Sequence, residues 1–152
     1  MSTPEERLAE LGFDVPEVAK PVAAYIPALR SGNYVFTSGQ LPMRGGELIT
    51  TGKVGGSVTP EQAVECAQQC ALNALAAIKA EVPLDQIKRI VKLVVFVAST
   101  PEFTGQPQIA NGASELVGEV FGDAGRHARS AVGVPVLPLD APVEIEMIVE
   151  VG

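Results

Sequence analysis

Positively charged residues are scarce in this sequence and nowhere clustered. Lysine and arginine together number 11, against 18 aspartates and glutamates, which gives a formal net charge of -7. A protein that binds nucleic acid normally gathers basic side chains on one face, where they displace the counterions of the phosphate backbone. The sequence therefore disfavours RNA or DNA as the principal partner.

Histidine and cysteine are also scarce, which excludes several kinds of catalytic centre. His127 is the only histidine, and one imidazole cannot form a histidine-based triad or a two-histidine metal site. Cys66 and Cys70 lie four residues apart in a helical pattern with no further cysteine or histidine nearby, so we expect them to fill the core rather than form a disulfide. We expect no metal, and we expect His127 to be a solvated loop residue.

Long hydrophobic runs and nucleotide-binding loops are absent as well. Residues 1–12 carry three glutamates and no apolar core, which is not the pattern of a signal peptide. No apolar run has the length needed to cross a bilayer. Gly52-Lys53 is followed by Val54 rather than by serine or threonine, so no phosphate-binding loop is present. We expect a cytoplasmic protein that needs no cofactor.

The chain does have the composition of one globular domain. Apolar residues make up 47% of its 152 residues, and a chain of this length buries about two-thirds of its unfolded surface. We treat residues 1–152 as a single domain, in which residues 1–20 form an N-terminal extension. That extension is predicted to be a short helix that begins at Thr3-Pro4 and stops at Gly12, followed by an extended connector from Pro16 to Pro21.

The strongest local signal is a capping box at residues 59–62, Thr-Pro-Glu-Gln, which predicts a helix over residues 60–81. A second helical region is predicted from Thr100 to Phe121, with an interruption between Gly105 and Gly112. The predicted strands are residues 24–30 and 34–38 as a hairpin, a looser hairpin within 45–56 around Leu48-Ile49, and the strands 87–99, 128–136 and 142–151.

The long strand 87–99 is apolar on both faces, and this determines the predicted architecture. Val91, Leu93, Val95 and Val97 are expected to point one way, and Val94, Phe96 and Ala98 the other. Strands buried on both faces need cover on both sides. Two helices cover only one face of a sheet, so we predict an α+β fold, one sheet with two helices on one face, that self-associates through the other face as a closed homo-oligomer.

A buried-strand context makes Arg129 the first candidate for chemistry. It lies in the strand-compatible run 129–134, where a charge is costly without an anionic partner. Its planar guanidinium can hold a substrate carboxylate by two parallel hydrogen bonds. The alternative is a structural ion pair with Glu144 or Glu146 on a neighbouring strand.

The alternating run 143–151 supplies the candidate carboxylates. Glu144 and Glu146 share one strand face, which is either a solvated face or part of a subunit junction where one carboxylate could exchange protons with a water. Ser38-Gly39-Gln40 follows a strand and offers a hydroxyl, a close backbone approach and an amide, but no base adjacent in sequence supports a serine nucleophile. Tyr25 is more typical of a core or interface residue than of a catalytic one.

Taken together, these segments resemble the Rid family, the reactive intermediate deaminases, also called the YjgF family or endoribonuclease L-PSP-like proteins. The resembling segments follow one another in the family's order over residues 21–151, and they are Tyr25, Gly32-Asn33, Thr37-Ser38-Gly39-Gln40-Leu41-Pro42, Val91–Val97, Ala128-Arg129-Ser130, Leu137-Pro138 and Val143–Glu146.

The resemblance implies a chorismate-mutase-like fold and a homotrimer with ligand sites in the clefts between subunits. It implies hydrolysis of enamines and imines, such as 2-aminoacrylate, to 2-keto acids and ammonia without a cofactor. By the same resemblance Arg129 would hold the carboxylate, the backbone of Ala131 would contact the reacting nitrogen, and Glu144 would position or activate the water. The remaining cleft residues implied by the resemblance are Tyr25, Ser38, Gly39 and Asn111.

The sequence departs from the family pattern at several positions. Ala131 stands where the family often has cysteine, and His127 where it often has proline. Residues 23–27, Ala-Ala-Tyr-Ile-Pro, replace the common Gly-Pro-Tyr-Ser-Gln segment. The chain also adds the N-terminal helix and residues near 106–112, which affects the assignment of Asn111. It is similar to a longer subgroup of the family.

Three functions are consistent with this reading. The first is an enamine/imine deaminase that acts on small carboxylate-bearing substrates of amino-acid metabolism. The second is a non-catalytic binder of small carboxylic acids with a regulatory role. The third is the endoribonuclease or translation-inhibitor activity that the older family name suggests, which the net charge and the single histidine oppose.

Overall fold

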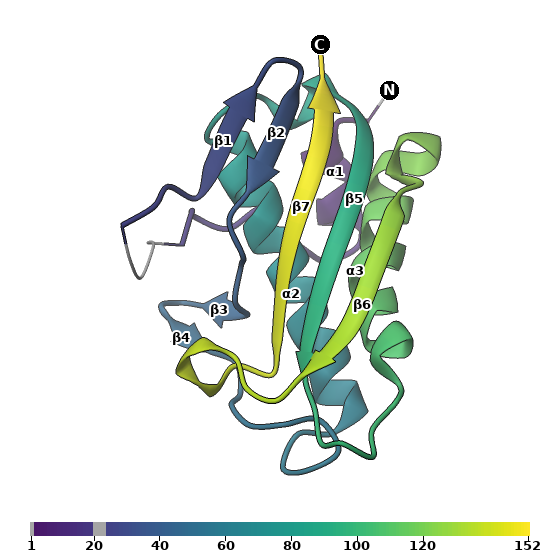
Figure 1. Ribbon diagram of the computed structural model, residues 1–152. Coiled ribbons are helices and arrows are strands. Elements are labelled where there is room, and N and C mark those ends of the chain that lie inside the picture. The colour runs from purple at the N-terminus through teal and green to yellow at the C-terminus, as the bar shows by residue number, and fades with distance from the viewer. Residues whose placement is uncertain (1, 20–23) are drawn as a thin grey trace.

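A five-stranded sheet with two long helices on one face dominates the computed structural model, which describes residues 2–19 and 24–152. The strands lie in the spatial order β1 (Ala28–Ser31), β2 (Tyr34–Thr37), β7 (Val143–Val151), β5 (Ile87–Ala98) and β6 (Ala128–Val134). Neighbouring strands are antiparallel except β5 and β6, which are parallel. Helices α2 (Pro60–Lys79) and α3 (Gln106–Phe121) pack together behind this sheet (Figure 1). The predicted α+β class is confirmed.

Helix α2 forms where the capping box predicted it. The Thr59 hydroxyl accepts a hydrogen bond from the Gln62 amide, and the Gln62 side chain accepts one from the Thr59 amide. These two bonds satisfy backbone donors that a helix N-terminus leaves unpaired. Cys66 and Cys70 are fully buried on the face of α2 that contributes to the core, as expected. Burial raises the pKa of Cys66 to about 11, with the charge of Glu65 adding to the effect, so the thiol stays protonated.

The predicted break within the second helical region is wrong. Residues 100–104 contain a turn, and α3 then runs without interruption from Gln106, with Gly105 as its N-cap residue. Gly112 lies inside the helix because α2 passes close by. A Cβ atom at position 112 would lie 2.7 Å from the backbone oxygen of Val64. This glycine therefore permits close helix packing rather than ending the helix.

The predicted facing of β5 is correct only for its second half. Leu93, Val95 and Val97 are fully buried beneath the helices, but Ile90 rather than Val91 shares their face. The pairing of β5 with β7 is irregular between Ile90 and Lys92, which shifts the alternation by one residue. The alternation of apolar residues along the sequence does not reveal such a bulge, because the bulge depends on the pairing with β7.

Two hairpins precede α2. The turn between β1 and β2 lies at Gly32-Asn33, within the predicted interval 31–33, and β1 runs from Ala28 to Ser31 rather than over 24–30. The second hairpin pairs β3 (Met43–Arg44) with β4 (Glu47–Leu48), so its turn is at Gly45-Gly46 and not around Leu48-Ile49. Both turn glycines have positive φ, 63° and 85°, a conformation that other residues rarely adopt.

Three short 3₁₀ turns and one short helix complete the structure: η1 (Leu84–Gln86), η2 (Gly122–Gly125), η3 (Pro138–Asp140) and α1 (Pro4–Glu10). Helix α1 lies against the end of α3, where Leu8 is fully buried and Arg7 Nη1 donates to the carbonyl of Val120 at 2.8 Å. The predicted connector 16–21 has no helix or strand over residues 16–19, and its last two residues lie outside the described part. No helix within residues 2–19 and 24–152 has both the length and the apolar character needed to cross a bilayer.

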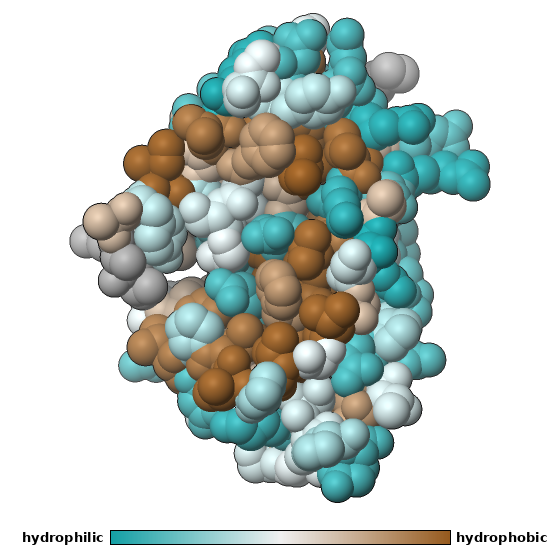
Figure 2. Space-filling model, in the orientation of Figure 1, coloured by the Kyte–Doolittle hydropathy of each residue, from teal (hydrophilic) through white to brown (hydrophobic). Residues whose placement is uncertain are grey.

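The face of the sheet opposite the helices carries apolar side chains in register across the strands. Leu29 pairs with Phe36, and Phe36 pairs with Ile148. On the other side of β7, Phe96 pairs with Val132 of β6. Leu29, Phe36 and Val132 are 55%, 41% and 44% exposed, which is high for such residues. Figure 2 views this face and shows hydrophobic groups gathered in two areas of it.

Candidate functional site

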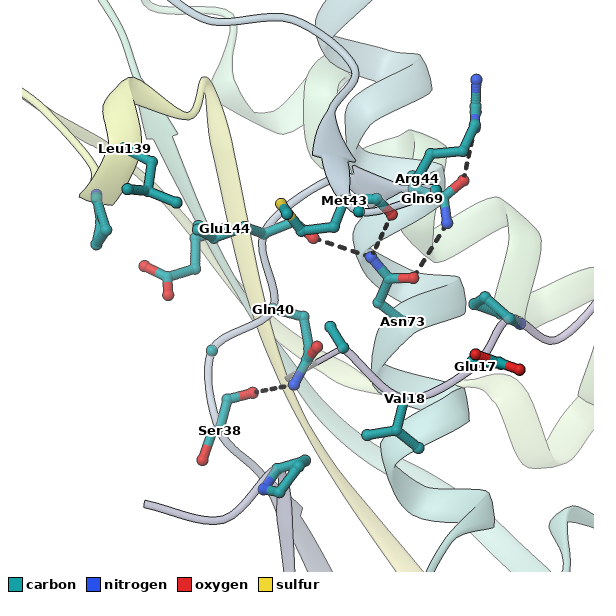
Figure 3. Close-up of a pocket in the computed structure, with 18 of the residues that line it drawn as sticks. Glu17, Val18, Ser38, Gln40, Met43, Arg44, Gln69, Asn73, Leu139 and Glu144 are labelled. Carbon is teal, nitrogen blue, oxygen red and sulfur yellow. Dashed lines mark hydrogen bonds between the residues drawn. The ribbon is translucent and has the colours of Figure 1, made fainter. Parts of the chain in front are cut away.

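A cavity of about 1050 Å³ lies at one side of the sheet, beside the beginning of β7 (Figure 3). Its walls come from seven parts of the chain: the connector 16–19, the segment before β1, the loop that follows β2, the β3–β4 hairpin, helix α2, the turn η3 and the beginning of β7. Four residues that the sequence analysis proposed for a binding site line this one cavity, namely Tyr25, Ser38, Gly39 and Glu144.

The loop after β2 reaches Glu144 because it pairs with the beginning of β7. The Gln40 amide donates to the carbonyl of Ile145 at 2.8 Å, and the Ile145 amide donates back at 3.0 Å. This pairing places Gly39 against the Glu144 side chain, and a Cβ atom at position 39 would overlap Glu144 Oε2. The Ser38 hydroxyl donates to the carbonyl of Ile26 at 2.6 Å, so it braces the loop.

Glu144 is the carboxyl group in this cavity with an altered acidity. Burial of its half-buried side chain, and then the charge of Glu146 on the same strand face, raise the pKa of Glu144 above its usual value. Both effects disfavour the charged form. A carboxyl group whose pKa is raised in this way holds a proton more readily, which suits a group that accepts and returns one.

Buried amides of α2 form a second wall that the sequence analysis missed. Gln69 Nε2 donates to Asn73 Oδ1 at 3.0 Å, and Asn73 Nδ2 donates to the carbonyls of Leu41 and Met43, both at 3.0 Å. Gln69 is 6% and Asn73 is 2% exposed. The signal was present in the sequence, since Asn73 is the only polar residue in the small and apolar stretch 70–78 and Gln69 precedes it by four residues.

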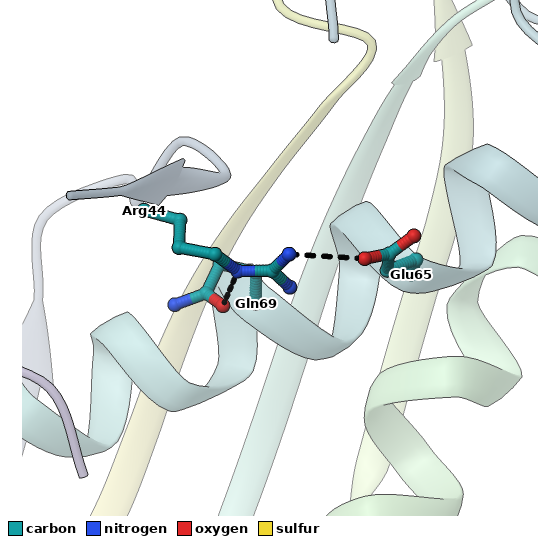
Figure 4. Close-up of polar contacts among 3 residues, drawn as sticks. All are labelled: Arg44, Glu65 and Gln69. Atoms are coloured by element: carbon teal, nitrogen blue, oxygen red, sulfur yellow. Dashed lines mark hydrogen bonds and ion pairs between the residues drawn. The ribbon is translucent and has the colours of Figure 1, made fainter. Parts of the chain in front are cut away.

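Arg44 connects this wall to the β3–β4 hairpin. Its Nε donates to Gln69 Oε1 at 3.1 Å, and its Nη1 lies 3.1 Å from Glu65 Oε2 (Figure 4). Glu65, Gln69 and Asn73 follow one another at four-residue spacing, so they share one face of α2. The network holds the hairpin over the cavity.

Arg129 lies apart from this cavity. Its Nη1 donates to Asn111 Oδ1 at 2.8 Å and to Ser114 Oγ at 3.1 Å, both on α3. Arg129 pairs with Leu93, whose side chain faces the helices, whereas Glu144 pairs with Phe96 on the other face. Arg129 and Glu144 of one chain therefore lie on opposite faces, with β5 between their strands.

The ion pair that offered an alternative role for Arg129 does not form. The described residues contain three salt bridges, Arg44–Glu65, Lys53–Asp140 and Lys79–Glu5, and Arg129 takes part in none of them. Ala131 lies two residues further along β6 and packs partly against the core. Asn111, proposed for the cleft, is brought to Arg129 rather than to the cavity.

His127 lies in the loop between η2 and β6 as expected, but it is half-buried and hydrogen-bonded rather than simply solvated. Its Nε2 lies 2.9 Å from Ser114 Oγ and its Nδ1 lies 2.6 Å from the carbonyl of Gly125. Separation along the sequence hid this contact, since Ser114 belongs to α3. Within the described ranges, no three histidine, cysteine, aspartate or glutamate side chains gather as metal ligands would.

Comparison with known proteins gives a family match over nearly the whole chain. Residues 5–151 match the model of the family described as "YjgF/chorismate_mutase-like, putative endoribonuclease". Protein TCP17 of Trypanosoma cruzi is 44% identical over 147 residues, which cover 95% of this chain and 92% of that protein. A protein of Dermatophagoides farinae named 2-iminobutanoate/2-iminopropanoate deaminase is 33% identical over 139 residues, 90% of this chain and 93% of its own.

A solved structure also superposes on the whole chain. A protein of unknown function from Agrobacterium tumefaciens aligns with a TM-score of 0.92 and 47% identity, covering 99% of this chain and 94% of its own. The likeness extends over both the sheet and the N-terminal extension.

Proposed function

Since the chain belongs to the YjgF/chorismate mutase-like family, we propose that it hydrolyses reactive 2-imino and 2-enamino acids to 2-keto acids and ammonia. The relative named as a deaminase of 2-iminobutanoate and 2-iminopropanoate supports this substrate class. The reaction adds water to the C2 carbon, breaks the bond between C2 and nitrogen, and needs no redox partner.

The proposal rests on the charge of Arg129, which is not paired with an acidic side chain in the described part of the chain. Its partners in the described residues are the neutral groups of Asn111 and Ser114, which engage only Nη1. The positive charge therefore remains uncompensated by any acidic side chain of the described chain. A guanidinium held in this way can bind a carboxylate through charge-assisted hydrogen bonds, each worth about 1.5–3 kcal/mol.

Glu144 has the properties that the hydrolytic step requires. Its raised pKa and its place in the cavity allow it to take a proton from the attacking water and deliver a proton to the departing nitrogen. The balance is one water consumed and one ammonia released, with Glu144 returned to its starting state.

The separation of Arg129 and Glu144 in one chain leads us to propose that a working site combines two copies. Closed symmetry would bring Arg129 of one copy to the cavity of the next, and the homotrimer implied by the family resemblance is the assembly we propose. The exposed apolar side chains on the sheet face (Figure 2) support burial of that face between copies.

The decisive assay generates a 2-imino acid in situ and follows its loss and the release of keto acid. Wild-type protein should exceed the spontaneous rate, and Arg129→Ala and Glu144→Gln should each return it close to that rate. Spontaneous loss alone, combined with a raised melting temperature in 2-ketobutyrate, would instead identify a non-catalytic binder of small acids.

Mixed oligomers test whether the site is shared. Inactive Arg129→Ala and Glu144→Gln chains, unfolded together and refolded at equal amounts, should regain about a quarter of wild-type activity, because random assortment rebuilds that share of the clefts. Recovery should fail if both residues act within one chain. Refolding each variant alone provides the control.

A further inference from the structure

His127 stands at one end of a chain of hydrogen bonds that ends on Arg129. Its Nδ1 lies 2.6 Å from the Gly125 carbonyl, its Nε2 lies 2.9 Å from Ser114 Oγ, and Ser114 Oγ lies 3.1 Å from Arg129 Nη1. Asn111, one turn before Ser114 on α3, accepts from the same Nη1 at 2.8 Å. These hydrogen bonds connect η2, α3 and β6, and they lie outside the cavity described above.

The chemistry of the partners fixes the direction of each bond. A backbone carbonyl only accepts, so Nδ1 of His127 must carry the proton. In the neutral ring Nε2 is then the acceptor, and the Ser114 hydroxyl donates its only proton there. A guanidinium only donates, so Ser114 turns a lone pair toward Arg129. The imidazole tautomer thereby orients the hydroxyl, and the hydroxyl in turn orients the guanidinium.

These bonds occupy one particular part of the guanidinium. Asn111 and Ser114 take the two protons of Nη1. Within residues 2–19 and 24–152, Nε and Nη2 of Arg129 have no hydrogen-bond partner. These two groups form the side of the guanidinium that can hold both oxygens of a carboxylate in parallel.

We propose that Ser114 and His127 are positioning residues that fix the Arg129 guanidinium so that its Nε and Nη2 groups receive the substrate carboxylate. This inference rests on the proposed function for the identity of the ligand, but the arrangement itself exists without a ligand. The Ser114 hydroxyl contacts Arg129 Nη1, on the side of the guanidinium away from Nε and Nη2, so its proposed role is exerted through Arg129 and not on the substrate.

The tautomer can be tested in the ligand-free protein. Because His127 is the only histidine, its two ring nitrogens give the only imidazole signals in a ¹⁵N NMR spectrum. We expect the neutral ring to carry its proton on Nδ1 and to leave Nε2 bare. We also expect slowed rotation of the Arg129 Nη groups, lost in Ser114→Ala. A protonated Nε2, or Arg129 signals unchanged in Ser114→Ala, would overturn the proposal whatever the protein's activity.

The effect on the ligand is tested by kinetics and binding. Ser114→Ala should raise the KM for the imino acid, and the Kd of 2-ketobutyrate, by roughly tenfold with little change in kcat. Ser114→Thr, which keeps the hydroxyl, should restore most of the affinity. A loss of kcat with unchanged KM would contradict a role in holding the carboxylate.

Ser99→Ala is a matched control for loss of stability. Ser99 is a half-buried serine that also connects the sheet with α3, since its hydroxyl donates to the carbonyl of Val97 at 3.1 Å and accepts from Gln106 Nε2 at 3.2 Å. It should lower the melting temperature about as much as Ser114→Ala without altering KM. If Ser99→Ala raised KM equally, the effect of Ser114 would be merely structural. If wild-type protein bound no keto acid while the NMR results held, the proposed function would fail and the positioning of Arg129 would stand.

Discussion

Gly39 lies so close to Glu144 that a methyl group at position 39 would overlap the Glu144 carboxylate. Two segments that are remote in sequence meet at this contact, the loop after β2 and the beginning of β7. The carboxyl group therefore rests on bare backbone, which holds it inside the cavity and limits its access to water. Any side chain at position 39 has to displace the group to which we assign proton transfer.

Gly39→Ala is expected to lower kcat by at least about tenfold with a smaller effect on folding, because general acid–base groups contribute roughly 10²–10⁴-fold when correctly placed. Initial rates of imine hydrolysis measure the change. Gly118→Ala is the matched control, since a Cβ there meets nothing within 4 Å. In helix α3 it should leave kcat unchanged and raise stability by roughly 0.5–1 kcal/mol. Equal kcat of the two variants would show that the close contact between Gly39 and Glu144 is not needed for activity.

The acidity of Glu144 predicts a dependence of stability on pH. Its pKa is raised in the folded protein, so the folded state binds the proton more tightly than the unfolded state does. The ionised form therefore destabilises the fold above the folded-state pKa, and this cost disappears as the pH falls below the unfolded value. Glu144→Gln should be more stable than wild type at neutral pH, with the difference shrinking toward pH 4. Urea unfolding at several pH values gives the comparison, and a difference that grows on acidification would contradict it.

The same group should shape the rate profile. If Glu144 must be ionised to activate water, kcat should rise with pH through the raised pKa and then level off. Rates measured across pH 4 to 8 should follow one ionisation. The residual activity of Glu144→Gln should not show this rise of kcat with pH. If the rise were unchanged in that variant, the ionisation would belong to another group.

The buried amide of Asn73 should matter for stability. Asn73→Ala removes two hydrogen bonds to the carbonyls of Leu41 and Met43 and leaves Gln69 without its acceptor. Unpaired buried polar groups cost about 1–3 kcal/mol each, so we expect a loss of a few kcal/mol in unfolding free energy. Gln108→Ala, on the exposed side of α3, should change stability by less than about 0.5 kcal/mol. Similar midpoints for both variants in urea would show that the network contributes little.

The apolar face of the sheet should determine the oligomeric state. Phe36→Asp places a charge in the middle of the row formed with Leu29 and Ile148, which is costly if that face is buried between copies. Sedimentation should then show monomers in place of the proposed trimers, together with loss of the proposed imine hydrolysis. Leu11→Asp is the control, because Leu11 is similarly exposed at the end of α1. A Phe36→Asp protein that stays trimeric would place the interface elsewhere.

Local signals made most elements of the fold predictable. The capping box at Thr59 fixed the beginning of α2, and Gly32-Asn33 marked the turn of the first hairpin, whereas the turn of the second was misplaced. Errors arose where a distant segment decided the outcome. Gly112 is typical of a helix breaker, but here it is needed because the backbone of Val64 on another helix lies too close for a side chain. The bulge after Ile90 depends on pairing with β7, which the order of residues along β5 does not encode.

The site was predictable in a different way. The ordered resemblance to the family identified Ser38, Gly39 and Glu144, and the structure brings these residues together through the Gln40–Ile145 pairing. The relation of His127 to Ser114 could not be inferred, because nothing in either sequence neighbourhood signals the other. Only the packing of α3 against β6 makes them neighbours.

The position of β7 between β2 and β5 has a consequence for how the molecule is made. β7 is the last strand along the chain, yet it is the only described strand that joins the β1–β2 hairpin to the β5–β6 pair. During translation the β1–β2 hairpin and the β5–β6 pair emerge before β7. The edges of β2 and β5 that β7 will later pair with are then unpaired. A message truncated before Val143 would yield fragments with exposed strand edges, prone to aggregate and to be degraded.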